Sequence, residues 1–382
     1  MNYSIIIAEF NPLSNGHKYI IEKTREMFPL DPIIIIMSGN FVQRGEPAII
    51  NKFERANAAT MLGASAVIEL PTIFSISSAE DFAFGAVKIA NSISGAKRIV
   101  FGSECGDISI LEKTAELLKS KPIQNEIKKH LSAGNSYATS LRLALNNNTI
   151  LNSPNNLLGI EYINAINQLN SSLQPVTIKR NYGYNDKSLS PFASSSALRE
   201  QVFAENLDCI KNCLPDLMLD KLKTAQTPVL DKLHSMLIYK LATMQLKDLQ
   251  KIDGINEGLE FRILDKANLS TNFGDLVAQI STKRYPESKV KRVLLNVLFD
   301  ITKKTKQTAK KIKPILNVLS IAKDKSILSA LSNSDGTLVL KVRDCDKLDT
   351  TQQQINHVTT LADKIYANLT NSPTSSIYNH KL

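Results

Sequence analysis

The first seventeen residues constrain the fold of this chain more than any other stretch. An apolar run at residues 5–8 leads into a turn that contains Pro12, and Gly16 and His17 then begin a helical pattern. A short apolar strand followed directly by a helix is typical of a parallel sheet with helices on both faces. The opening therefore predicts an α/β fold in which this strand is buried.

The remainder of the first 200 residues continues the alternation of strands and helices. Further strands are predicted at residues 33–37, 66–70, 98–101 and 176–179, and helices at residues 18–27, 52–62 and 78–93. Ligands of such sheets bind beyond the carboxyl ends of the strands. We therefore expect one crevice to be lined by the turns at residues 9–16, 38–45, 71 and 102–106.

The pattern changes near residue 205, after which helices dominate. Apolar residues recur at helical spacing between Val290 and Ile301, and one short strand is predicted at residues 337–342. A chain of 382 residues is long enough for two domains. We predict a Rossmann-like α/β domain with a parallel sheet at residues 1–204, followed by a mostly α-helical domain at residues 205–382.

Positive charge is concentrated in the second half of the chain. The net charge is +10; residues 201–382 hold 27 Lys and Arg against 19 Asp and Glu, whereas residues 1–200 hold 19 against 17. A basic helical half joined to a nearly neutral α/β half favours a polyanionic partner, with RNA the natural candidate. A solvated lysine-rich surface would give the same composition, so both interpretations stay open.

The cysteines and the hydropathy indicate an ordinary cytoplasmic protein. The four cysteines lack the spacing of a disulfide framework or a zinc site. No apolar run reaches the length needed to span a membrane, and Met1 leads into a strand rather than a signal peptide. We expect no membrane association and no metal site built from the protein alone.

Two helix beginnings are candidate phosphate sites. Gly16 would let a phosphate approach the backbone closely, and His17 could donate a hydrogen bond to it. Ser194, Ser196 and Arg199 at a second helix start could cradle further phosphates. A capped helix explains the second pattern equally well. The strand, turn and helix order favours the nucleotide interpretation of the first.

Polar side chains after the other strands are further candidates. A long turn is predicted to form a substrate pocket from Ser38, Asn40, Gln43 and Arg44. Lys52 and Arg55 are either pocket cations or surface charges. Gly102 would admit a flat ligand such as adenine, and an Asn155–Asn156 pair could cap a helix or bind a ribose or base. No P-loop or dinucleotide-binding glycine pattern is present.

These motifs resemble a known family. Residues 10–12, 15–17 and 194–199 are similar to the two phosphate-binding motifs of the HIGH-type nucleotidylyltransferase superfamily. More specifically, the chain resembles the bacterial tRNA(Met) cytidine acetate ligase family, in order and over most of its length. This second resemblance rests on residues 37–49, 67–71, 101–104, 153–159, 257–263 and 282–285.

The resemblance implies an activity and its substrates. Members of this family use ATP to activate acetate as acetyl-adenylate, with release of pyrophosphate. The acetyl group then passes to the N4 amine of the wobble cytidine in elongator tRNA(Met). Mg²⁺ is expected to accompany the triphosphate, with Glu104 as the single candidate protein ligand. No stable protein partner is expected.

The resemblance and the motifs together give a set of predicted site residues. Ser14, Gly16 and His17 are the predicted catalytic residues. Contacts to the tRNA backbone are predicted for Lys283, Arg284, Lys291 and Arg292. The predicted ATP-binding residues are Ile7, Ala8, Glu9, Phe10, Asn11, Pro12, Leu13, Ser14, Asn15, Gly16, His17, Lys18, Tyr19, Ile20, Gly102, Asn155, Asn156, Arg180, Ser194, Ser196 and Arg199.

One position departs from the family pattern and leads to a prediction. The motif usually reads His-Asn-Gly-His, but its first histidine is Ser14 here, and Leu13 replaces the preceding aromatic residue. Serine is shorter than histidine and cannot carry positive charge. We expect Ser14→His to raise the rate of acetate-dependent ATP–pyrophosphate exchange. An unchanged rate would mean that this position does not matter in this protein.

Two other functions fit parts of the sequence. A nucleotidylyltransferase that acts on a small metabolite would explain the first 200 residues but would leave the basic helical half without a role. A non-catalytic RNA-binding relative would explain the loss of the motif histidine at Ser14. Acetate-dependent exchange of label between ATP and pyrophosphate separates these alternatives.

Overall fold

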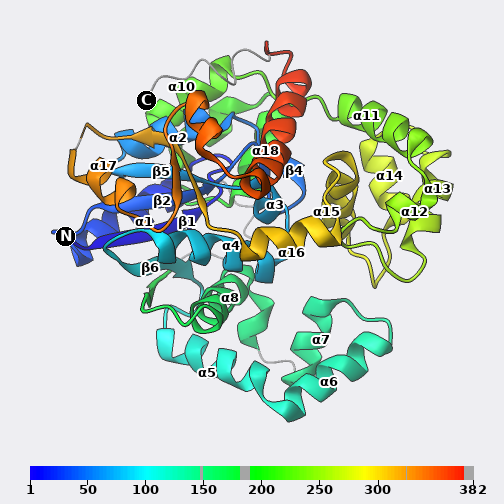
Figure 1. Ribbon diagram of the computed structural model, residues 1–382, viewed down its shortest axis with the longest axis horizontal. Coiled ribbons are helices and arrows are strands. Elements are labelled where there is room, and N and C mark those ends of the chain that lie inside the picture. The colour runs from blue at the N-terminus through cyan, green and yellow to red at the C-terminus, as the bar shows by residue number, and fades with distance from the viewer. Residues whose placement is uncertain (147–148, 181–189, 324, 374–382) are drawn as a thin grey trace.

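A seven-stranded sheet forms the centre of the computed structural model, which describes residues 1–146, 149–180, 190–323 and 325–373 (Figure 1). Its strand order is β7-β6-β1-β2-β5-β8-β9. The first five strands in this order run parallel, and β8 pairs antiparallel with β5. The bounds are β1 (Tyr3–Ala8), β2 (Ile33–Ser38), β5 (Ala66–Leu70), β6 (Ala96–Ser103), β7 (Gln174–Lys179), β8 (Ile315–Ile321) and β9 (Thr337–Val339).

Helices cover both faces of this sheet because alternate strand residues point to opposite sides. Ile5 and Ile34 belong to the core shared with α4 and α8, whereas Ile6 and Ile35 pack in the core shared with α1, α2 and α10. The sheet is therefore buried on both faces, as its unbroken isoleucine runs predict. The bounds are α1 (Asn15–Met27), α2 (Lys52–Met61), α4 (Ala79–Ser92), α8 (Pro154–Gln168), α9 (Ser195–Phe203) and α10 (Asp216–Thr224).

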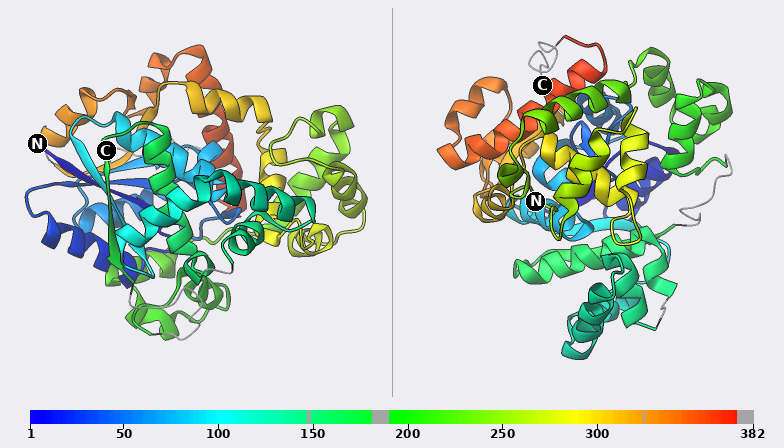
Figure 2. Two further views of the ribbon diagram at one scale, coloured as in Figure 1. Left: turned by 90° about the horizontal axis from the view of Figure 1, so that it is seen from below. Right: turned by 90° about the vertical axis from the view of Figure 1, so that its right-hand side faces the viewer.

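Two groups of helices project from the sheet, as Figures 1 and 2 show. The first lies between β6 and α8 in sequence, and the second precedes β8. The first group is α5 (Ile108–Lys119), α6 (Lys121–Ser132) and α7 (Tyr137–Ala144). The second is α11 (Leu230–Thr243), α12 (Leu246–Leu249), α13 (Leu259–Ala267), α14 (Phe273–Ile280), α15 (Glu287–Leu298) and α16 (Lys303–Lys311).

Three helices and a small hairpin complete the chain. The hairpin packs against α3, and its Glu46 pairs with Lys291 of α15, whereas α18 packs against α3, α11 and α16. Across the described ranges, no helix is long and apolar enough to cross a membrane. The elements are β3 (Phe41–Val42), β4 (Glu46–Pro47), α3 (Thr72–Ser75), α17 (Lys325–Ser332) and α18 (Thr350–Leu369).

The structure confirms the predicted fold class: a parallel sheet with alternating helices, followed by a largely helical region. All five strands predicted in the first 200 residues are present, as is β9. Strand β8, however, was not predicted; it joins the sheet beside β5, with Val67 opposite Ser320. The second half of the chain therefore contributes strands to the same sheet as well as helices.

Candidate active site

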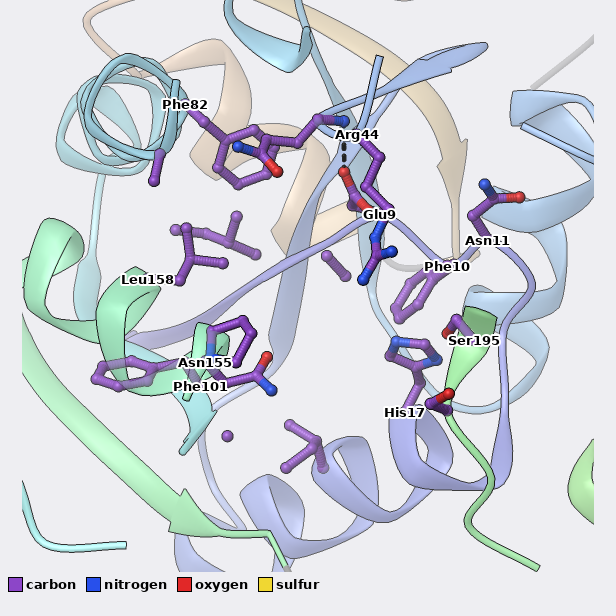
Figure 3. Close-up of a pocket in the computed structure, with 18 of the residues that line it drawn as sticks. Glu9, Phe10, Asn11, His17, Arg44, Phe82, Phe101, Asn155, Leu158 and Ser195 are labelled. Carbon is purple, nitrogen blue, oxygen red and sulfur yellow. Dashed lines mark hydrogen bonds between the residues drawn. The ribbon is translucent and has the colours of Figure 1, made fainter. Parts of the chain in front are cut away.

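A cavity of about 300 Å³ lies at the carboxyl ends of β1 and β6 (Figure 3). The turn of the β3–β4 hairpin, α4, α8 and the beginning of α9 close its sides. Three of the four predicted turns meet here, those after β1, β2 and β6. The expectation for Pro71 is wrong: it lies at two smaller pockets with Ile315, because α18 covers this end of β5 and the Thr359 hydroxyl accepts a hydrogen bond from Thr72 N–H.

The predicted residues divide into those that line the cavity and those that do not. The first set comprises Ile7, Ala8, Glu9, Phe10, Asn11, His17, Ile20, Gln43, Arg44, Gly102, Asn155, Arg180, Ser194, Ser196 and Arg199. The second set, outside its lining, comprises Pro12, Leu13, Ser14, Asn15, Gly16, Lys18, Tyr19, Ser38, Asn40 and Asn156, together with Lys283, Arg284, Lys291 and Arg292.

The imidazole of His17 points into the cavity from the first turn of α1 (Figure 3). Its Nδ1 accepts a hydrogen bond from the Ser14 backbone N–H at 3.0 Å and lies 3.0 Å from the Ser14 hydroxyl. The edge of Phe10 supports the ring at a centroid distance of 5.0 Å. Because Nδ1 is an acceptor, the proton of the neutral ring must lie on Nε2.

The charge state of His17 follows from its surroundings. Burial, and in second place the positive charge of Arg180, lower the pKa of His17 to about 3. At neutral pH the ring is therefore uncharged. It presents Nε2–H as a hydrogen-bond donor, and Nε2 has no partner among the described residues. Ser14 thus fixes the tautomer of His17 without lining the cavity.

Arg199 occupies one end of the cavity, at the beginning of α9. Its Nη1 donates to the Asn11 backbone oxygen at 2.9 Å and to that of Ser195 at 3.2 Å. The Ser194 hydroxyl accepts from Ala197 N–H at 3.2 Å, so it caps the helix. The buried Asn11 Nδ2 has no hydrogen-bond partner in the described ranges. This end therefore combines a cation and a helix N-terminus, both of which favour an anion.

The Asn155–Asn156 pair has two separate roles. Asn155 lines the cavity, whereas Asn156 is buried and accepts a hydrogen bond from Cys105 N–H at 3.1 Å. Glu104 accepts hydrogen bonds from Asn155 Nδ2 at 2.6 Å and from Asn156 N–H at 3.0 Å. Its carboxylate therefore caps α8 and orients Asn155. The described residues contain no cluster of three metal-ligating side chains.

The long turn after β2 is only partly in the cavity. Gln43 and Arg44 line it, but Asn40 turns away and donates to the Asp363 carboxylate at 2.8 Å. Lys52 and Arg55 are buried rather than exposed, and neither reaches the cavity. Arg55 instead donates to four backbone oxygens, Glu9, Ser38, Gly39 and Ile50, and thereby fixes the ends of β1 and β2.

The cavity also has an apolar wall, which the sequence motifs did not predict. Phe82 of α4 and Leu158 and Tyr162 of α8 face Phe101 at the end of β6. Phe101 and Tyr162 are in edge contact, with ring centroids 5.5 Å apart. In the sequence these residues belong to ordinary amphipathic helix patterns, which do not distinguish a pocket wall from the core.

Two of the four residues predicted to contact tRNA also hold the hairpin. Lys291 Nζ lies 2.6 Å from Glu46 Oε1, and Arg292 donates to the Gln43 backbone oxygen at 3.2 Å. Arg284 pairs with Glu257. Lys283 is exposed, and no ion pair of its side chain is found in the described structure. The prediction that these four residues bind tRNA remains untested.

This arrangement of a strand, a histidine at a helix start and a second anion-binding helix start defines the class of a nucleotidyltransferase. The model of the HIGH Nucleotidyl Transferase family matches residues 1–381, and the chain belongs to that family. The recognition of the tRNA(Met) cytidine acetate ligase family is confirmed as well. A protein of that name from Thermoanaerobacter sp. (strain X514) is 38% identical, and the match covers 78% of each chain.

Further similar proteins extend over more of the chain. The tRNA(Met) cytidine acetate ligase of Caldicellulosiruptor saccharolyticus is 36% identical over 90% of this chain and 86% of its own. A crystal structure of Thermotoga maritima TmcAL bound with alpha-thio ATP is 28% identical, with a TM-score of 0.89 over 97% of this chain and 95% of that one. The apo form has a TM-score of 0.91 at 27% identity and covers 100% and 99%.

Proposed function

We propose that this protein activates acetate with ATP as acetyl-adenylate and transfers the acetyl group to N4 of the wobble cytidine of elongator tRNA(Met). The proposal is carried by one observation: His17, Arg199, Gly102 and Asn155, which the sequence motifs predict to bind ATP, line a single cavity. The names of the relatives support the ligase activity and its two substrates acetate and tRNA(Met). Because the proposed substrate is a tRNA, we also propose that the reaction takes place in the cytoplasm.

Each part of the cavity has a role in this proposal. The Nε2–H of His17 would donate to the α-phosphate as charge develops during adenylation. Arg199, Asn11 and the N-terminus of α9 would hold the remaining phosphates. Gly102 and Asn155 would receive the nucleoside. Mg²⁺ would enter with the triphosphate as part of the substrate, with phosphate oxygens and water supplying most of its ligands.

We also propose a division of work along the chain. Residues 1–204 would bind ATP and acetate, and residues 205–382 would bind the tRNA. The division would be functional rather than structural, because β8 and β9 lie in the same sheet as β1.

Two measurements test the function. Purified protein should catalyse ATP–pyrophosphate exchange only when acetate is present, and it should form N4-acetylcytidine in an elongator tRNA(Met) transcript, detected by nucleoside mass spectrometry. Exchange that required another acid would indicate a metabolite enzyme. The absence of any exchange would indicate a non-catalytic RNA-binding relative.

The contacts of the basic residues give a prediction for charge reversal. Lys283→Glu should weaken tRNA binding and lower the slope of log K against log salt by about 1 while exchange stays at the wild-type rate. Lys291→Glu should lower exchange itself, because it places a carboxylate against Glu46, which lies 3.9 Å from Arg199 of the cavity. Filter binding and exchange assays measure the two effects. Equal effects of both variants on exchange would contradict the assignment.

A further inference from the structure

Glu9 is the only acidic residue among the described residues that line the cavity. It follows β1 and lies in a wall otherwise made of cationic, neutral polar and apolar side chains. A carboxylate beside a triphosphate and an acetate opposes the binding of both anions. A role in the binding of ATP or acetate therefore does not explain why an acid occupies this position.

The carboxylate of Glu9 is held by one oxygen and open at the other. Oε1 accepts a hydrogen bond from the Gln43 backbone N–H at 2.6 Å, drawn as the dashed line in Figure 3. Oε2 has no hydrogen-bond partner in the described part of the chain. Gln43 is in turn fixed by Arg292, and its amide donates to the Ser77 oxygen at 3.3 Å. Oε2 is therefore an acceptor held in a defined position at the cavity.

We propose that Oε2 of Glu9 accepts a hydrogen bond from the N4 amine of the target cytidine and takes its proton during acetyl transfer. The inference rests on the function proposed above and assigns one residue to its second step. A carboxylate is the side chain that suits the N4 amine of cytosine, because that amine only donates. No other carboxylate among the described lining residues is available for this task.

The step balances in atoms and charge. The N4 lone pair forms a bond to the carbonyl carbon of acetyl-adenylate, and the bond from that carbon to the phosphate oxygen breaks. AMP leaves with the electron pair of the broken bond. One N4 proton moves to Glu9 Oε2, which becomes a carboxylic acid and releases the proton to solvent after the products depart. N4 retains its second proton in the amide.

The surroundings of Glu9 suit a proton acceptor. Burial raises the pKa of this carboxyl, whereas the Gln43 N–H and the positive charges of Arg199, Arg44 and Arg55 partly oppose the rise. Tyr162 of α8 is a further titratable group close enough to interact with it, and neutral His17 lines the same cavity. A carboxylate with a raised pKa is a stronger base, and proton transfer becomes more efficient as the pKa of the base approaches the working pH.

The test separates the two half-reactions of the full-length protein. Glu9→Gln keeps the oxygen that accepts from Gln43 N–H but removes the basic oxygen. Transfer is measured with synthetic acetyl-adenylate and an elongator tRNA(Met) transcript, and adenylation is measured by ATP–pyrophosphate exchange. We expect the ratio of the transfer rate to the exchange rate to fall about 100-fold. In the wild type, transfer should decline as the pH falls through the raised pKa of Glu9, and this acid limb should be absent in the variant.

Glu26→Gln is the matched control, because it removes one carboxylate from the exposed end of α1 and should leave both rates unchanged. Equal losses of exchange and transfer in Glu9→Gln would overturn the inference, since Glu9 would then serve the ATP site or the hairpin. Transfer at the wild-type rate would overturn it too. If the wild type showed no acetate-dependent exchange, the proposed function would fail instead.

Discussion

Replacement of His17 by alanine should lower acetate-dependent ATP–pyrophosphate exchange about 100-fold while the protein remains folded. The Nε2–H of this ring is a donor held in place before the reaction begins, since Ser14 N–H fixes the tautomer and Phe10 supports the ring. Loss of one such donor to developing charge commonly costs about 3 kcal/mol. Exchange kinetics measure the loss, and circular dichroism verifies the fold.

Two further variants make the His17 prediction specific. His17→Gln keeps an N–H donor near the position of Nε2 and should retain more exchange than His17→Ala. His357→Ala removes an exposed histidine of α18 and should have no effect. Equal activity of the alanine and glutamine variants would contradict a donor role for this ring, as would a wild-type rate in His17→Ala.

The neutral state of His17 also predicts a pH dependence. Because burial lowers its pKa to about 3, the ring stays neutral throughout the range in which exchange can be assayed, and no titration near pH 6.5 should come from it. The unfolded chain binds a proton at His17 below about pH 6.5, whereas the folded chain does not. Keeping the ring neutral in the folded state therefore costs no stability above pH 6.5. As the pH falls below that value, the free energy of unfolding decreases. His17→Ala should remove this part of the acid destabilisation.

The central strands could be predicted from the sequence because the physical signal is local. The isoleucine runs at residues 5–7 of β1 and 33–36 of β2 are buried on both faces of the sheet, so every position of these two runs is apolar. Strand β8 lacks this signal, since it contains Asn317 and Ser320 and follows a lysine-rich helix. Its place beside β5 depends on a pairing across about 250 residues of sequence, which no local pattern encodes.

The site was predictable where its residues end strands or begin helices. Gly102 and His17 are such positions, because backbone geometry alone brings them to one edge of the sheet. Phe82 and Tyr162 were missed because their helical spacing is that of core residues. The contacts of Lys291 with Glu46 and of Arg292 with Gln43 join segments about 245 residues apart. The sequence shows that these side chains are basic, but it does not show which distant residues they contact.

Replacement of Lys52 by methionine should lower the free energy of unfolding by about 4 kcal/mol. Lys52 Nζ lies 2.8 Å from Glu69 Oε1 and 2.5 Å from Asp363 Oδ2, and all three side chains are buried. Asn40 donates to Asp363, and Asn317 donates to Glu69 at 2.6 Å. The cluster therefore joins α2, β5, β8 and α18. Through Asn40 it also contacts the turn that carries Gln43 and Arg44. Without Lys52, two buried carboxylates would lose their ion-pair partner.

Urea unfolding measures this loss, and the chain offers controls for it. Lys221→Met removes the partly exposed pair with Glu54 at 2.7 Å and should cost less than about 1 kcal/mol. The triple variant Lys52→Met, Glu69→Gln, Asp363→Asn leaves no unpaired charge, so it should be more stable than Lys52→Met alone. Lower pH should narrow the difference in free energy of unfolding between Lys52→Met and the wild type, because burial raises the pKa of Glu69 and its protonation removes one of the two unpaired buried charges. If Lys52→Met were as stable as the triple variant, the charge of Lys52 would not be what holds α18 against the sheet.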